Sequence, residues 1–262
     1  MSEPVATQVD ARPRWAGYEV LLVLAVSLGQ SAVYSILSIA DRLTRQEALN
    51  QQSSQLNSAV TPDRPWLDLS YQVVNIVFPL VPVLIALYLL AVRNPAGDPR
   101  PGRVIGFDLR RPGFDLGFGF LIAFCIGVPG LGLYLGARTL GLNTQVQASG
   151  LADTWWTIPV LILAAVENAV LEEVIMLGFL FTRLRQLSWS WPVIIIVSAV
   201  IRGSYHLYQG FGGFTGNLIM GVIFGLIYLK WKRVMPLVVA HTLLDIASFV
   251  GYSLLAPHVD WL

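Results

Sequence analysis

Seven long apolar runs constrain this chain more than any other feature of its sequence. A transmembrane helix needs about 20 consecutive, mostly apolar residues. The sequence offers seven candidates, at residues 17–40, 69–92, 115–137, 156–182, 190–208, 215–231 and 234–256. The composition agrees, because 55% of the 262 residues are hydrophobic and only 13% are charged, about half the charged share of a soluble domain. We therefore expect an all-α fold, a polytopic membrane helical bundle of about seven transmembrane helices.

The connectors between these runs set the expected organisation. Residues 17–262 are expected to form a single membrane-embedded domain, preceded by a polar tail at residues 1–16. The first apolar run is long enough to span a bilayer and lacks a small-residue cleavage pattern, so we expect a retained helix and not a signal peptide. The connectors 41–68 and 93–113 are expected at the membrane surface, the first with a short helix. The brief connector 187–191 predicts a tight antiparallel hairpin.

Lysine and arginine residues give the expected orientation. They favour the cytoplasmic side of a membrane, and with the N-terminus inside, the cytoplasmic segments hold twelve of them against four in the outside connectors. We therefore expect a multi-pass integral membrane protein with a cytoplasmic N-terminus. The apolar runs imply the lipid bilayer as a partner. The net charge of +1 says nothing about partners, and the sequence has no basic tract for nucleic acid, so we expect none to bind. Cys125, the single cysteine, excludes an internal disulfide and a multi-cysteine metal site. The oligomeric state stays open.

Polar side chains inside the apolar runs are the second informative feature. A charged group at the bilayer centre costs at least about 2.5–3.5 kcal/mol, so such groups usually mark function. Here they concentrate in the last four runs, as Glu167, Asn168, Glu172, Glu173, Arg202, His206, Asn217, His241 and Asp245. Residues four apart share one helix face. This spacing predicts three polar rows, namely Asn168 with Glu172, Arg202 with His206, and His241 with Asp245.

Counting from the hairpin turn predicts which of these groups meet. Glu172 lies 17 residues before Trp189 and His206 lies 17 residues after it, so both are expected at the same depth, about 25 Å from the turn. His241 and Asp245 lie only 8 and 12 residues past the next turn, at Arg233. They join the same site only if that turn lies deeper or the last helix is offset.

The chemistry of these groups suits hydrolysis. Two adjacent buried carboxylates cannot easily both stay ionised, so one becomes a plausible base near neutral pH. A carboxylate with a histidine can deprotonate a water molecule. A second histidine with a nearby aspartate can orient a group, stabilise an oxyanion or bind a metal. Glu172, His206, His241 and Asp245 also form a reasonable zinc set, so zinc and a metal-free mechanism are both open.

Several of these residues also have simpler interpretations. Glu167 can face a headgroup or pair locally, and His206 can be interfacial. Asn217 is expected to cap the start of a helix, which is the commoner role of that residue type. Two alternative functions stay open as well: a non-catalytic membrane protein of the same fold, acting as scaffold, immunity or regulatory factor, and a proton-coupled transporter. The absence of repeat symmetry argues against the transporter.

The same residues carry a family resemblance over about residues 155–250, the expected protease-like core. The sequence resembles the CAAX prenyl protease and bacteriocin-processing (CPBP, Abi) family of intramembrane proteases. That family's pattern is Glu-Glu-x-x-x-Arg, then Phe-x-x-x-His, then His-x-x-x-Asn or Asp. This chain has Glu172 and Glu173, then His206 in "RGSYHLYQG", then His241 and Asp245 in "HTLLD".

The resemblance implies an intramembrane endopeptidase that acts on a membrane-associated protein or peptide. Glu172 would activate a water with His206, while His241 and Asp245 would hold the oxyanion or orient the site. Glu173 would have a structural or tuning role. Members of the family are described both as metalloproteases with zinc and as metal-free glutamate proteases. The resemblance also implies a bacterial plasma membrane as location.

Two positions depart from the family pattern. Leu177 stands where the family has arginine, and Arg202 stands where it has phenylalanine. We expect these departures to be linked, with Arg202 supplying the cation that position 177 lacks and contacting Glu173 from the neighbouring helix. They also keep the non-catalytic alternative open.

Overall fold

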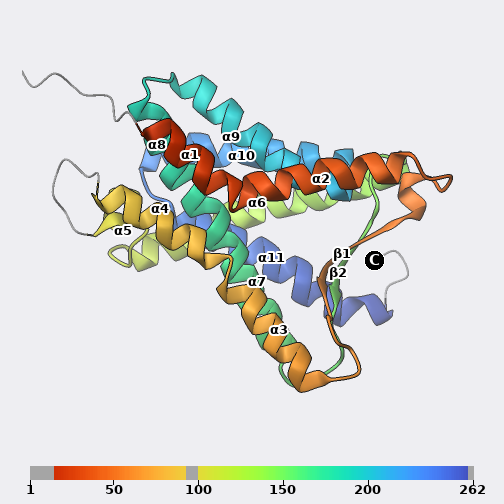
Figure 1. The fold of residues 1–262 in the computed structure, drawn as a ribbon. Helices are drawn as coiled ribbons and strands as arrows, with labels where there is room; N and C mark the ends of the chain where they lie inside the picture. The colour runs from red at the N-terminus through yellow and green to blue at the C-terminus, as the bar shows by residue number, and fades with distance from the viewer. Residues whose placement is uncertain (1–14, 93–99, 259–262) are drawn as a thin grey trace, which may run out of the picture.

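The computed structural model describes residues 15–92 and 100–258, which form a largely helical fold (Figure 1). All seven predicted apolar runs fall on helices. The longer helices are α1 (Ala16–Ala25), α2 (Leu28–Leu43), α3 (Pro65–Val77), α4 (Leu80–Val92), α6 (Pro112–Thr139), α7 (Thr157–Glu173), α9 (Trp191–Tyr205), α10 (Phe211–Trp231) and α11 (Met235–Leu255). Shorter elements are α5 (Pro101–Val104), α8 (Leu180–Gln186) and the 3₁₀ turns Leu49–Gln51, Leu207–Gln209 and Ala256–His258.

The count of seven spans is not confirmed, although the helical membrane fold is. Within the described residues, four helical segments are long and apolar enough to cross a bilayer: Pro65–Val92, α6, α10 and α11. A fifth is the pair α1 and α2, which is bent by 51°. Helix α9 is apolar but has only 15 residues, and α7 has 17 residues that include three glutamates. Helix α7 therefore differs from an ordinary transmembrane helix in carrying the acidic residues of the site.

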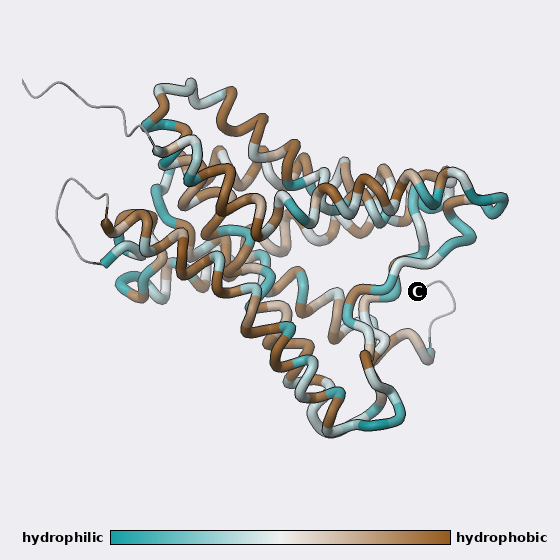
Figure 2. Tube along the Cα trace, viewed as in Figure 1, coloured by the Kyte–Doolittle hydropathy of each residue, from teal (hydrophilic) through white to brown (hydrophobic). Residues whose placement is uncertain are grey.

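The outer surfaces of the helices fit a lipid environment. Figure 2 shows that apolar residues predominate along the helices and that polar residues occur at many of the turns. Leu22, Leu84 and Phe120 are 65–66% exposed. Apolar exposure on this scale marks an interaction surface in a folded protein, and the length of the helices makes the bilayer the natural partner.

A small parallel sheet is present that the sequence did not predict. Strand β1 (Ser53–Ser58) pairs with β2 (Gln145–Gly150), with Ser53 opposite Gln145. Both strands come from polar connectors, and Figure 1 shows them lying between the end of α2 and the arm formed by α3 and α7. In the first connector the expected surface helix is reduced to the 3₁₀ turn Leu49–Gln51. The fold is thus all-α apart from this one pair of strands.

The turn between α10 and α11 is held in place by residues that are distant in the sequence. The Arg233 guanidinium donates to both carboxylate oxygens of Asp115, at 2.9 and 2.6 Å, and to Asp108 at 3.1 Å. The hydrogen bonds to Asp115, with partial burial opposing them, raise the pKa of Arg233. The Val234 amide donates to the Ile105 carbonyl at 2.9 Å, and Val234 is fully buried. This arrangement fixes where α11 starts.

Part of the predicted surface connector can be placed. Residues 100–111 contain α5 and cover the turn at Arg233. Residues 93–99, like most of the expected polar tail at 1–16, lie outside the described residues, as do Arg12, Arg14 and Arg93 of the orientation count. The cytoplasmic orientation of the N-terminus therefore stays a prediction.

Helices α7, α8 and α9 form the predicted antiparallel hairpin, which carries the site. Between α7 and α8 the chain makes a π-helical turn, Val174–Phe179, in which every residue is buried. The turn near Trp189 includes Ser188 at φ 67°. Helix α10 packs closely on α9, because a Cβ at Gly221 would lie 2.9 Å from the Ala199 Cα. This glycine lets two backbones meet beside the site.

Candidate active site

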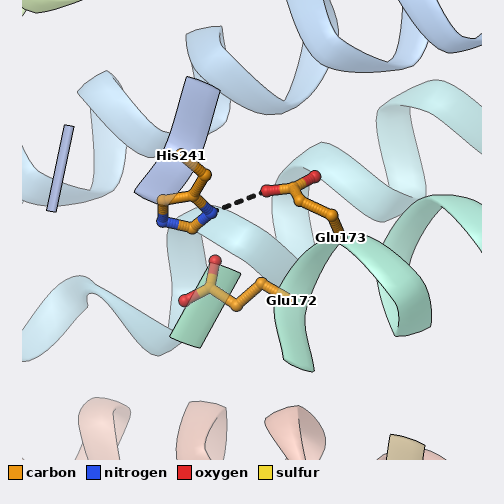
Figure 3. Close-up of side chains that lie close together, drawn as sticks. All are labelled: Glu172, Glu173 and His241. Carbon is orange, nitrogen blue, oxygen red and sulfur yellow. Dashed lines mark hydrogen bonds and ion pairs between the residues drawn. The ribbon is translucent and has the colours of Figure 1, made fainter. Parts of the chain in front are cut away.

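The two adjacent glutamates of α7 point into different surroundings. Glu173 is fully buried, whereas Glu172 is 7% exposed. They lie at the end of α7, directly before the π-helical turn. Successive residues of an α-helix point about 100° apart. The two side chains can therefore contact different residues of the neighbouring helices. Figure 3 shows the Glu173 carboxylate directed at His241 and the Glu172 carboxylate lying on another side of the same ring.

Glu173 is the centre of a buried ion network. One of its carboxylate oxygens, Oε1, accepts a hydrogen bond from Arg202 Nη2 at 2.6 Å and lies 2.7 Å from His241 Nδ1. Arg202 is 1% exposed, and its guanidinium also lies 5.5 Å from the centre of the Phe224 ring. The predicted contact between Arg202 and Glu173 is therefore present. The network joins α7, α9 and α11.

Glu172 faces the other way and makes different contacts. Its Oε2 accepts a hydrogen bond from the Tyr205 hydroxyl at 2.7 Å. Its Oε1 lies 3.7 Å from His206 Nε2, and Arg202 Nη1 lies 3.7 Å from Oε2. Glu172 and His206 meet, as their equal distances from the hairpin turn predicted. Neither ring nitrogen of His206 has a hydrogen-bond partner among the described residues.

His241 and Asp245 also reach the site. His241 Nε2 lies 3.7 Å from Asp245 Oδ1, while Nδ1 of the same ring contacts Glu173. Both residues do so although they lie only 8 and 12 residues past the turn at Arg233. The imidazole of His241 thus lies between two carboxylates.

A cavity of about 1020 Å³ opens onto these groups. Glu172, His206, His241 and Asp245 line it, but Glu173 and Arg202 do not. Its walls are mostly apolar side chains of α6 and α11, among them Phe120, Phe124, Val128, Leu131, Leu244 and Phe249. Strands β1 and β2 close one part of it, through residues such as Leu56 and Val146. The cavity therefore joins a polar floor to apolar walls.

Three further residues belong to the surroundings of the site. Tyr205 was not predicted, because an aromatic residue beside a histidine in an apolar run has no distinctive signal. Asn217 was predicted as a helix cap, and this is wrong: α10 already begins at Phe211, and the Asn217 side chain donates to the Gly213 carbonyl at 3.1 Å and lines the cavity. Glu167 is 6% exposed, which excludes a headgroup contact.

The metal-binding potential of the site rests on a slightly different set from the one expected. Glu172, Glu173 and His241 each offer a ligand atom, and these atoms all lie within 4.8 Å of one another. Carboxylate and imidazole donors suit zinc. Arg202, however, already places a positive charge on Glu173. The donor types fit a zinc ion, while the charge balance does not require one.

Comparison with known families assigns the part of the chain that holds this site. Residues 154–247 match the family model described as Type II CAAX prenyl endopeptidase Rce1-like. Over these residues the chain is similar to that family. The match runs from just before α7 to Asp245 and beyond, so it contains both glutamates, both histidines and Arg202. Comparison with curated proteins and with solved structures gave no match.

Proposed function

We propose that this protein is an intramembrane endopeptidase that hydrolyses a peptide bond through a water activated by Glu172 and His206. One observation carries the proposal. The Glu172 carboxylate and the His206 ring lie 3.7 Å apart at the cavity, too far for a direct hydrogen bond but close enough to bind the same water. Similarity to the endopeptidase family over residues 154–247 supports it.

The remaining residues fit the steps of such a hydrolysis. Glu172 takes a proton from the water, whose oxygen attacks the carbonyl carbon of the scissile bond. The carbonyl oxygen becomes an oxyanion, which His241 Nε2 stabilises from the cavity side while Glu173 and Asp245 support a positive imidazole. Glu172 then returns the proton to the amine that leaves. Glu173 and Arg202 act as positioning residues, because neither lines the cavity.

The cavity walls indicate the class of substrate. Phe120, Phe124 and Val128 of α6 line the cavity and are 64–65% exposed. An extended apolar wall beside a polar floor fits a peptide that carries a long apolar group or a membrane-embedded segment. We propose a membrane-associated protein or peptide as the substrate, of which a prenylated C-terminal peptide is the first to test.

Zinc stays an open part of this proposal. Glu172, Glu173 and His241, whose ligand atoms lie within 4.8 Å of one another, are the residues that would hold it. A bound zinc ion would lower the pKa of a coordinated water and polarise the carbonyl. Metal analysis of the purified protein and its sensitivity to chelators test this directly. Retention of full activity after the metal is removed would establish the metal-free glutamate mechanism.

The decisive experiment measures cleavage by purified protein in liposomes. The probe is a quenched fluorescent peptide with a farnesylated Cys-aliphatic-aliphatic-X end, beside its unprenylated counterpart. We expect cleavage by the wild type and its loss in Glu172→Ala, His206→Ala and His241→Ala. Ser204→Ala serves as a matched control on α9, because its hydroxyl bonds only the Val200 carbonyl. Equal activity in all variants would overturn the proposal. A folded wild type that cleaves neither probe would favour the non-catalytic alternative.

A further inference from the structure

A second, polar hollow lies beside Tyr205, the tyrosine that hydrogen-bonds Glu172. It measures about 470 Å³ and is lined by Gln30, Ser31, Tyr34, Ser35 and Ser38 of α2 and by Tyr205 and Tyr208 opposite them. Every one of these side chains carries a hydroxyl or an amide. The larger cavity has mostly apolar walls, so the two spaces differ in chemistry. Gln30, Ser31 and Tyr34 are exposed, which opens the hollow to the outside.

The polar residues of the hollow follow one face of α2. Ser31, Ser35 and Ser38 are separated by four and three residues, the spacing of a single helix face. A further step of four leads to Arg42, at the polar end of the helix. Ile36 and Leu37 on other faces of α2 are apolar and 51% and 60% exposed. Contact with lipid thus explains the apolar residues on those faces, but it does not explain the row of serines.

Packing explains only one of the serines. The Ser35 hydroxyl accepts a hydrogen bond from the Tyr208 amide at 2.7 Å and is 3% exposed. It anchors the 3₁₀ turn Leu207–Gln209 to α2. The hydroxyls of Ser31 and Ser38 make no hydrogen bond to the described part of the chain, and both line the hollow. Polar groups in this position suit ordered water, which needs several polar partners.

Tyr205 connects the hollow to the base. Its side chain lines the hollow, and its hydroxyl donates to Glu172 Oε2 at 2.7 Å. Tyr208 lines both the hollow and the larger cavity. The Tyr205 side chain therefore both lines the hollow and bonds the carboxylate of Glu172, whose other oxygen faces His206.

From this juxtaposition we infer that the hollow along α2 is the route by which water reaches Glu172, and that Tyr205 is a positioning residue at its inner end. The inference rests on the proposed hydrolysis, which consumes one water for each bond broken. An apolar substrate segment in the larger cavity would block water from the α6 and α11 side. A separate polar entrance would let water reach Glu172 while substrate fills the larger cavity. The Tyr205 hydroxyl keeps Glu172 Oε1 directed at His206 while water exchanges.

Thiol labelling tests the route without any need for proteolysis. Cys125 is the single cysteine of the chain, so Cys125→Ala gives a background without thiols. Into it we would place Ser31→Cys, Ser38→Cys and, as matched controls on the lipid-facing side of α2, Ile36→Cys and Leu37→Cys. A charged methanethiosulfonate reagent is then supplied on both sides of proteoliposomes. We expect the two serine positions to react at least about tenfold faster than the controls. Equal rates at all four positions would overturn the route.

The kinetics of cleavage of the farnesylated peptide then test whether the hollow takes part in hydrolysis. The double variant Ser31→Leu, Ser38→Leu fills the hollow and is expected to lower kcat about tenfold with KM for the farnesylated peptide unchanged. Ile36→Leu should match the wild type. Tyr205→Phe keeps the ring and removes only the hydroxyl, so kcat should fall with KM unchanged. A rise in KM with constant kcat would show that the hollow binds substrate and would refute the water route.

Discussion

Glu172 and Glu173 are neighbours in the chain, yet their side chains lie in two different regions of the molecule. The Glu173 region is closed: Arg202 and His241 both bind one carboxylate oxygen, and the carboxylate is fully buried. The Glu172 region is open, with a cavity beside it and a His206 ring whose nitrogens make no hydrogen bond within the described residues. A buried carboxylate paired through one oxygen with two helices can hold them in place but has no room for a substrate, whereas an open one can take a proton. The comparison therefore separates a structural from a chemical role within one dipeptide.

The strongest way to test this comparison is to change each glutamate in turn. Glu172→Gln should lower kcat by about 10²–10⁴-fold, the usual contribution of a general base, and leave the unfolding temperature near that of the wild type. Glu173→Ala should instead destabilise the fold by about 3 kcal/mol, because it removes the closer of the two carboxylates that pair with the buried Arg202. Thermal unfolding in detergent and cleavage rates on the same samples measure both effects.

The pattern of the two results matters more than either alone. If Glu172→Gln destabilised the protein as much as Glu173→Ala, the open and closed regions would not differ in role. Leu163→Ala is a suitable control on the same helix, because Leu163 is 54% exposed and does not line the cavity.

A second test exchanges the two positions that depart from the family pattern. Arg202→Phe removes the cation that pairs with Glu173 at 2.6 Å and should destabilise the fold by about 3 kcal/mol or more. Adding Leu177→Arg should restore part of the loss, because it returns a cation to the position at which the family keeps arginine. Unfolding temperatures of the single and double variants decide this. A double variant no more stable than Arg202→Phe would contradict the exchange.

The sequence predicted the contacts of this site that lie within the hairpin of α7, α8 and α9. Equal counts from Trp189 placed Glu172 beside His206. The contact of Arg202 with Glu173 was predicted from the missing arginine at position 177 and from the place of Arg202 one turn before His206. The depth of His241 could not be derived, because it depends on how Arg233 binds Asp108 and Asp115, more than 100 residues earlier in the chain. Periodicity also gave no sign of Tyr205 as a partner of Glu172. The apolar runs located the helices, but not the bend between α1 and α2 or the polar strands β1 and β2.

A third and smaller effect is expected at Asp245. Its carboxylate lies 3.7 Å from His241 Nε2, beyond direct hydrogen-bonding distance, and the family pattern accepts asparagine at this position. Asp245→Asn should therefore lower kcat/KM by less than about tenfold, since one pKa unit or hydrogen bond is worth about 1.4 kcal/mol. Asp245→Leu, which removes every polar contact, should cost more. Equal losses in the two variants would show that the charge itself is required.

The smallest expected effect concerns pH and the surface contacts of Arg233. Although burial opposes it, the Arg110 amide and the Arg233 guanidinium lower the pKa of Asp108 below its ordinary value of 3.8. A carboxylate with a lowered pKa in the folded state stabilises that state above pH 3.8, and the contribution is lost as the pH falls below it. Asp108→Asn should thus reduce the acid sensitivity of the unfolding temperature between pH 6 and pH 3, by less than about 1 kcal/mol. An unchanged acid response would show that Asp108 contributes nothing measurable.

The π-helical turn Val174–Phe179 has a consequence for the direction of every residue after it. In an unbroken α-helix, positions 172 and 183 would share a face, because eleven residues make about three full turns. The one extra residue of a π turn rotates the following helix by about 100°. Arg183 therefore binds Glu19 of α1, at 2.8 Å, and the Leu89 carbonyl. Deleting one residue from the turn would return Arg183 to the angular position of Glu172 and remove α1 from its partner.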